Sequence, residues 1–197
     1  MNSPVALPCL PEEIDSFLAR PTPGVLETLR RLPGDILVVG AGGKMGPTLC
    51  LMAAKALREI GSPSRVRAVS RFSNVKSREL LEVSGVETIG CDLLDRDSVA
   101  DLPDAPNILF LAGQKFGTGS GPELTWAMNT LVPSHVAERY PASRIVAFST
   151  GCVYSFASVA SGGSRETDPT EPPGDYANSC LARERIFSYY SQKNKTP

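Results

Sequence analysis

The stretch 36-ILVVGAGGKMG-46 decides the fold of this chain, because it leads from an apolar run through a glycine-rich loop into a helix. The run from Ile36 to Val39 is short and continuous, which indicates a strand buried on both faces. The helix that follows tolerates Pro47 in its first turn, and Gly61 stops it. A strand, a tight loop and a helix in this order form the first unit of an α/β domain.

The loop itself has the chemistry of a dinucleotide-binding turn. Its glycines fit the spacing Gly-x-x-Gly-x-x-Gly and not the strict Gly-x-Gly-x-x-Gly, because position 45 is Met. Glycines allow the backbone to approach a pyrophosphate closely, and the N–H groups and dipole at the start of the helix favour the anion. We therefore predict that the phosphates are bound by Gly40, Gly42, Gly43, Lys44, Met45 and Gly46. A structural glycine turn without a ligand is the alternative.

Outward from this loop the chain alternates between strands and helices. Further strands are expected at 65–71, 86–92, 107–113 and 143–150, and helices at 77–85, at 122–140 and from Tyr176 onward. Apolar strands that are each followed by a helix predict a parallel sheet covered on both faces. The expected fold is a Rossmann-type, doubly wound parallel sheet with three layers, α/β/α. Residues 35–197 would form this dinucleotide-binding domain, and residues 1–34 a helical N-terminal extension.

The end of the second strand bears on which dinucleotide binds. An NAD site places an acid there to accept from the ribose hydroxyls, whereas the 2′-phosphate of NADP favours an arginine. Here the segment reads 70-SRFSN-74, with Arg71 and no acid, and Lys44 is a second candidate cation. The pattern leans toward NADP(H), with a plain solvated surface charge as the alternative for Arg71.

Composition excludes several other classes. The 197 residues suffice for one sizeable domain, and 42% hydrophobic and 21% charged residues are ordinary for a soluble globular protein. A net charge of −1 gives no electrostatic reason to expect nucleic acid or a membrane as partner, and no apolar run approaches a bilayer span. The N-terminus does not resemble a signal peptide. Five cysteines without metal-like spacing indicate reduced thiols in a cytoplasmic protein and no metal site.

Two further features concern the last part of the chain. The loop 155–175 is long for a compact domain, which marks it as a functional segment, and Asp175 is expected to cap the helix that follows. The chain ends just after that helix, where such a sheet normally receives another strand. We expect a fragment of a longer protein, and the alternative is a sheet closed by a partner, such as a second copy in a homodimer.

Several segments together resemble the extended short-chain dehydrogenase/reductase family, in its NAD-dependent epimerase/dehydratase group. The resemblance runs from about Asp35 to the end of the chain and is carried by 39-VGAGGKMG-46, 91-CDLLD-95, 109-LFLAG-113, 148-FSTGCVY-154 and 175-DYANSCLARE-184. It implies an NAD(P) cofactor and a small-molecule substrate. It further implies that the cofactor is lined by Asp92, Leu93, Ala112 and Gly113, with Asn129 as a structural or relay residue.

The same resemblance implies a reaction site. Thr150 takes the place of the catalytic Ser/Thr, and Tyr176 would be the catalytic acid/base. The family's lysine, four residues after the tyrosine, is Cys180 here. A tyrosine has an ordinary pKa of about 10, which a nearby cation lowers and a thiol does not.

The role of Cys180 has two interpretations, a small apolar filler or a reactive thiol. Arg183 and Arg185 could supply the lost cation, although neither lies at a spacing that faces Tyr176 directly. The only histidine, His135, fits a packed position on its helix.

Two functions follow. The first is an NAD(P)-dependent oxidoreductase or epimerase that acts on a sugar-nucleotide-like substrate, which Thr150 and Tyr176 favour. The second is a catalytically degenerate NAD(P)-binding protein, a sensor or structural subunit, which the lost lysine favours.

Overall fold

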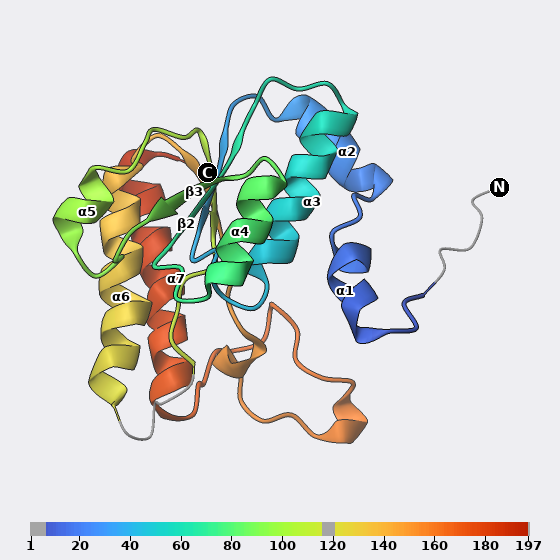
Figure 1. Ribbon diagram of the computed structural model, residues 1–197. Helices are drawn as coiled ribbons and strands as arrows, with labels where there is room; N and C mark the ends of the chain where they lie inside the picture. Colours follow the sequence, from blue (N-terminus) through green and yellow to red (C-terminus); the bar gives the residue numbers. More distant parts are fainter. Residues whose placement is uncertain (1–6, 116–120, 197) are drawn as a thin grey trace. The chain divides into compact units, whose positions relative to one another are not determined.

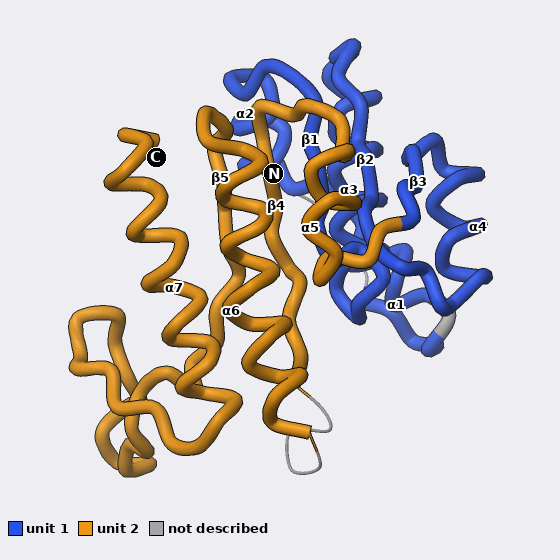
Figure 2. Tube along the Cα trace, turned by 90° about the vertical axis from the view of Figure 1, so that its left-hand side faces the viewer, with its two compact units in different colours: residues 1–90 blue, residues 91–197 orange. Residues whose placement is uncertain are grey.

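The structure is a computed structural model that describes residues 7–115 and 121–196 (Figure 1). It divides into two compact units, residues 1–90 and residues 91–197, which Figure 2 shows in blue and orange.

The first unit contains three parallel strands in the order β3-β2-β1. Its elements are α1 (Pro11–Leu18), α2 (Pro23–Arg31), β1 (Ile36–Val39), α3 (Gly46–Glu59), β2 (Val66–Ser70), α4 (Val75–Val83) and β3 (Glu87–Gly90). Ile36 of β1 lies opposite Val66 of β2, and Arg67 of β2 lies opposite Glu87 of β3. All residues of β1 are buried, as the unbroken apolar run predicts. Helix α3 packs on β2, and α1 and α2 pack against α3.

The second unit contains two parallel strands, β4 and β5, in which Asn107 lies opposite Arg144. Its elements are α5 (Arg96–Ala100), β4 (Asn107–Phe110), α6 (Pro122–Arg139), β5 (Arg144–Ala147), the 3-10 turns η1 (Gly151–Val153) and η2 (Val159–Ser161), and α7 (Gly174–Asn194). Helices α6 and α7 run side by side (Figure 1). Phe187 of α7 meets Phe110 of β4 edge to face, with ring centroids 5.0 Å apart, and so anchors α7 over the strand.

The expected strands and helices are all present, with ends that differ by a few residues. Helix α5 was not expected, because its five residues are too short for a periodic pattern; the Asp95 side chain begins it by accepting a hydrogen bond from Asp97 N at 3.1 Å. The expectation for Asp175 is wrong. Helix α7 begins at Gly174, and the Asp175 carboxylate accepts a hydrogen bond from Trp126 Nε1 at 2.8 Å instead of capping the helix.

No helix in the described part of the chain is both long and apolar enough to cross a membrane.

Candidate functional site

The glycine loop of the first unit is tied to the neighbouring strand by its backbone. The N–H groups of Gly40 and Ala41 both donate to the carbonyl of Val69, at 2.9 and 3.1 Å. Gly40 has a φ of 87°, in the left-handed region that favours glycine. The chain therefore leaves β1 in a sharp turn held against the end of β2.

Two other glycines of the loop are required by close approach. A Cβ at Gly46 would lie 2.1 Å from the Ala41 carbonyl oxygen, so the start of α3 packs directly on the loop backbone. A Cβ at Gly42 would lie 2.4 Å from Ser70 Oγ at the end of β2. At Gly43 the closest atom would be 3.4 Å away, an ordinary contact. The third glycine of the spacing thus serves helix–loop packing, as expected for a dinucleotide-binding turn.

The start of α3 suits an anion. Among the described residues no side chain caps this helix at Met45, and its first turn carries no acid. Lys44 and Met45 are exposed beside it. The N–H groups and the positive end of the helix dipole are therefore available to a phosphate. These residues fit the pyrophosphate of a dinucleotide.

The end of β2 turns sharply after Arg71, which is exposed. Phe72 is buried and has a φ of 48°, a conformation that is rare for a bulky residue. A bulky residue in this conformation is held by the surrounding structure, and no sequence pattern predicted it. The turn fixes the backbone on both sides of Arg71.

In the second unit, the residues expected to line a cofactor follow β3 and β4. Asp92 is exposed and its carboxylate accepts from Leu94 N at 3.1 Å. Leu93 is buried, and its carbonyl lies 3.2 Å from Nδ1 of His135, in agreement with a packed histidine. Ala112 is buried and Gly113 exposed.

Asn129 joins the end of β4 to α7. It is fully buried, and its amide exchanges hydrogen bonds with the backbone of Gln114, at 3.0 and 3.3 Å. Its Nδ2 also donates to Ser179 Oγ at 2.9 Å, and Ser179 donates in turn to the carbonyl of Tyr176 at 2.9 Å. The residue implied to be a relay or structural asparagine therefore holds the segment after β4 against the start of α7.

Thr150, Tyr176 and Cys180 come together in this unit. Thr150 begins η1, where its hydroxyl accepts from Cys152 N at 3.2 Å. The side chain of Thr150 lies near Tyr176 and lowers the pKa of the phenol. Burial is the strongest influence on Tyr176, followed by Cys180 when its thiol ionises at alkaline pH, and together they raise the pKa of the phenol above its ordinary value.

Cys180 is fully buried, and burial raises the pKa of its thiol. A thiol in that state stays protonated at neutral pH and is a poor nucleophile. The environment favours the interpretation of Cys180 as a small buried filler.

The glycine loop and the residues around Tyr176 lie within a segment that matches a protein family. Residues 36–197 match the model of the NAD dependent epimerase/dehydratase family. The chain belongs to this family. The resemblance drawn from the sequence motifs is thereby confirmed.

Solved structures of epimerases share the fold of this family member. UDP-glucuronic acid 4-epimerase from Bacillus cereus, in complex with NAD, aligns with a TM-score of 0.67 and 22% identity over 83% of this chain and 54% of that one. The UDP-Glc/GlcNAc 4-epimerase of Campylobacter jejuni aligns with a TM-score of 0.68 and 18% identity, over 83% and 50%. The chain thus spans about half the length of these enzymes. The expected Rossmann-type fold is confirmed. No curated protein matches the sequence.

One residue of this epimerase/dehydratase chain lies closer to Tyr176 than its spacing suggests. Arg183 is buried, at 6% exposure, and its charge lowers the pKa of Tyr176. Long side chains on a helix point back toward its N-terminus, which brings Arg183 over the turn that contains Cys180. Arg183 was also the nearer of the two candidate cations by sequence, and its spacing of seven residues from Tyr176 corresponds to two turns on the same face of a helix. Arg185, the other candidate cation, is exposed.

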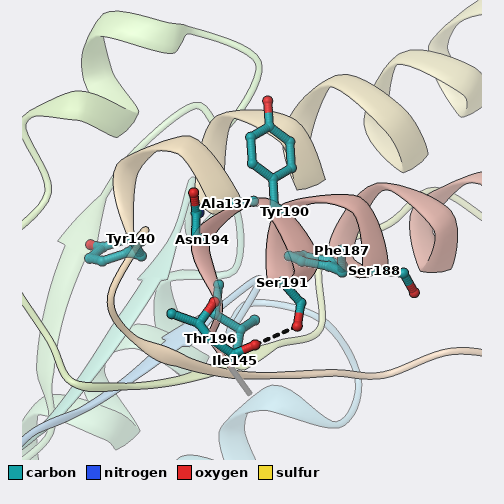
Figure 3. A pocket seen from close by; sticks show the side chains of 9 residues that line it. All are labelled: Ala137, Tyr140, Ile145, Phe187, Ser188, Tyr190, Ser191, Asn194 and Thr196. Carbon is teal, nitrogen blue, oxygen red and sulfur yellow. Dashed lines mark hydrogen bonds between the residues drawn. The ribbon is translucent and has the colours of Figure 1, made fainter.

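A separate hollow lies at the other end of α7 (Figure 3). Its lining comes from α6, β5 and the last turns of α7, and the Ser191 hydroxyl donates there to the carbonyl of Thr196. None of the site residues expected from the sequence lines it. The candidate reaction site of the second unit is thus at the N-terminal end of α7.

Proposed function

We propose that this protein binds a nicotinamide dinucleotide and catalyses an oxidoreductase or epimerase reaction on a sugar nucleotide or a related small molecule. The observation that carries the proposal is that Thr150 and Tyr176, which come from separate elements of the second unit, lie near enough for the Thr150 side chain to lower the pKa of the phenol. The epimerase/dehydratase family to which the chain belongs is described as NAD dependent. Bacillus cereus UDP-glucuronic acid 4-epimerase, which shares the fold, has been solved with UDP-glucuronic acid and NAD.

The proposed chemistry divides between two side chains. Thr150 would hydrogen-bond the reacting oxygen of the substrate and hold it beside Tyr176. Tyr176 Oη, as phenolate, would accept the hydroxyl proton during oxidation and return a proton during reduction. The hydride chemistry would come from the nicotinamide ring of the bound cofactor.

The first unit contains the groups proposed to bind the phosphates of the cofactor. The glycine loop and the uncapped start of α3 suit its pyrophosphate. Arg71 and Lys44 are exposed, and the segment after β2 contains no acid, which supports NADP(H) over NAD(H). Asp92, Leu93, Ala112 and Gly113 are proposed to line the adenine and ribose parts, and Asn129 to hold the segment after β4.

A second function has a specific observation in its favour. Burial and Cys180 raise the pKa of Tyr176, which opposes formation of the phenolate at neutral pH. A catalytically degenerate NAD(P)-binding protein, a sensor or a structural subunit, would need the glycine loop and not the phenolate.

The two functions are separated by binding and turnover. The chain is titrated with NADPH and NADH by fluorescence, and turnover is measured with a panel of UDP-sugars before and after Cys180→Lys. Binding with turnover in the parent supports the enzyme. Binding without turnover, with activity gained in Cys180→Lys, supports the degenerate site. Absence of binding to either dinucleotide would overturn both.

Cofactor choice is tested by Arg71→Asp, with Arg30→Asp as a control that makes the same charge change at an exposed residue of α2. We expect Arg71→Asp to weaken NADPH about tenfold or more and to leave NADH nearly unchanged, because the lost charge faces only the 2′-phosphate. Equal losses for both dinucleotides would remove Arg71 from the proposal.

A homodimer stays a prediction for this chain. Sedimentation at several protein concentrations, with and without cofactor, measures it directly.

A further inference from the structure

The guanidinium of Arg183 is the most unusual charge in the second unit. Arg183 is only 6% exposed, yet none of the ion pairs among the described residues involves it. Its Nε has no hydrogen-bond partner in the described structure. An arginine is rarely this buried without a carboxylate, because the desolvated charge costs several kcal/mol. We therefore looked for charged or titratable groups near the Arg183 guanidinium.

The position of the guanidinium is well defined. Arg183 Nη1 donates to the carbonyl of Ala112 at 3.2 Å, so the side chain crosses from α7 to the segment after β4. A Cβ at Gly113 would lie 2.8 Å from the same nitrogen. Glycine at position 113 therefore leaves the space that the guanidinium occupies.

The charge acts on the two titratable groups nearest to the reaction site. It lowers the pKa of Tyr176 and that of Cys180, against the upward effect of burial on both. The other titratable groups that act there are Cys152 of η1 and Glu184 of α7, and both raise the pKa of Cys180. Glu184 accepts a hydrogen bond from the Ser149 hydroxyl, which engages its carboxylate. Arg183 is the cation among these groups.

We propose that Arg183 supplies, from position 183, the positive charge that the family's lysine would supply from position 180. This inference rests on the proposed enzymatic function and extends it with a positioning residue that acts through Tyr176. Its unpartnered Nε leaves one buried N–H for an acceptor on a bound cofactor or substrate.

The same arrangement accounts for the cysteine. Asn129 lies near both residues: a Cβ at Gly113 would be 2.9 Å from its Oδ1 and 2.8 Å from Arg183 Nη1, and its Nδ2 lies 3.9 Å from Cys180 Sγ. A lysine at 180 would place a second cation next to the guanidinium, and like charges in a buried site are unfavourable. A small uncharged residue removes that conflict. Cys180 and Arg183 thus form a coupled pair, in which the cation has moved by three residues along the helix.

The test measures the titration of Tyr176 in the complete chain, without cofactor. Ring-labelled tyrosine is followed by NMR as a function of pH, and Tyr176→Phe identifies the signal among the five tyrosines. Arg183→Gln should move the Tyr176 titration to higher pH. Arg183→Lys should move it less, because the charge is retained. The double variant Arg183→Gln with Cys180→Lys should restore it toward the parent. Arg185→Gln, an exposed control on the same helix, should leave it unchanged.

Equal titrations for Arg183→Gln and Arg183→Lys would overturn the inference, as would a failure of Cys180→Lys to reverse Arg183→Gln. Circular dichroism verifies that each variant is folded, and the comparison with Arg183→Lys remains decisive if Arg183→Gln is not. Dinucleotide binding is measured in parallel. A chain that binds no dinucleotide contradicts the proposed function, whereas a chain that binds but shows no charge-dependent titration contradicts only the role of Arg183. Where turnover is present, kcat of Arg183→Gln should fall roughly tenfold or more near neutral pH, with recovery at higher pH.

Discussion

The glycine loop of the first unit and the start of α7 in the second unit are specified in different ways. The loop is held by backbone contacts: two N–H groups donate to one carbonyl of β2, and the start of α3 touches the Ala41 carbonyl. The start of α7 is held by side chains, through Asn129, Ser179 and Arg183. A close contact with the backbone permits only glycine at that position. A network of side chains can be formed by different residue types at different positions.

This difference explains why one motif matches the family pattern and the other departs from it. Two glycines of the spacing are imposed by the backbone: Gly40 by its φ of 87°, and Gly46 because its Cβ would lie 2.1 Å from the Ala41 carbonyl oxygen. In α7 we propose that the positive charge comes from position 183 in place of position 180, which a contact between side chains permits. The side-chain motif at the start of α7 therefore tolerates substitution more readily than the glycine motif, in which any side chain would clash.

The largest expected effect tests the loop. Gly46→Ala would place a Cβ 2.1 Å from the Ala41 carbonyl oxygen, and the start of α3 would have to move. We expect a loss of about 3 kcal/mol or more in the free energy of unfolding, together with loss of dinucleotide binding. Urea unfolding and fluorescence titration measure these two quantities.

Gly43→Ala is the matched control, because its Cβ would meet only an ordinary contact at 3.4 Å. It should change stability by less than about 1 kcal/mol. If the two variants are equally stable, backbone contact does not specify this loop and the comparison fails.

The next effect tests the side-chain network. Asn129→Ala would leave the backbone of Gln114 and the hydroxyl of Ser179 without their buried partner. We expect a loss of about 2–3 kcal/mol in the free energy of unfolding. Asn178→Ala removes an exposed asparagine of α7 whose amide also makes two hydrogen bonds, and should cost about 1 kcal/mol or less. Equal losses measured by urea unfolding would mean that burial adds nothing to the network.

The smallest effect compares buried and exposed thiols. Burial raises the pKa of Cys50 in α3 to about 12, whereas an unfolded cysteine titrates near its ordinary value of about 8.5. The unfolded chain therefore loses this proton first, and the contribution of the neutral thiol to stability is lost as the pH rises from about 9 to about 12.

At about pH 10, Cys50→Ala should lose about 2 kcal/mol less stability than the parent, relative to neutral pH, in urea unfolding. Cys152→Ala, at an exposed position, should follow the parent. Parallel pH curves for all three proteins would show that Cys50 is not buried in solution.

Much of the fold could be predicted from the sequence. The unbroken apolar run of β1 and the period of α3 are local signals, and they place a parallel strand and its helix without any tertiary information. Helix α5 and the turn at Phe72 were not predicted, because the first is too short for a period and the second depends on contacts with the end of β2. The proposed boundary between residues 34 and 35 stays a prediction.

The candidate site was predictable in its residue types and not in its electrostatics. The motifs name Thr150, Tyr176 and Cys180, and the structure brings them together. The pKa of Tyr176 depends on burial and on every nearby charge, and sequence spacing describes neither. Arg183 is the clearest case, since its burial and its hydrogen bond to the Ala112 carbonyl depend on how α7 packs against the segment after β4.

The sequence by itself determined the alternation of strands and helices, the glycine loop and the replacement of the family's lysine by Cys180. Each of these features depends on the identity or the periodic spacing of residues that are close in sequence. Local sterics and burial are therefore enough to determine them. The tertiary structure decided that Gly46 touches the loop backbone, that Asn129 holds α7, and that Arg183 is buried with its guanidinium against the Ala112 carbonyl. Those outcomes depend on which distant segments meet, because desolvation and charge act through space and not along the chain.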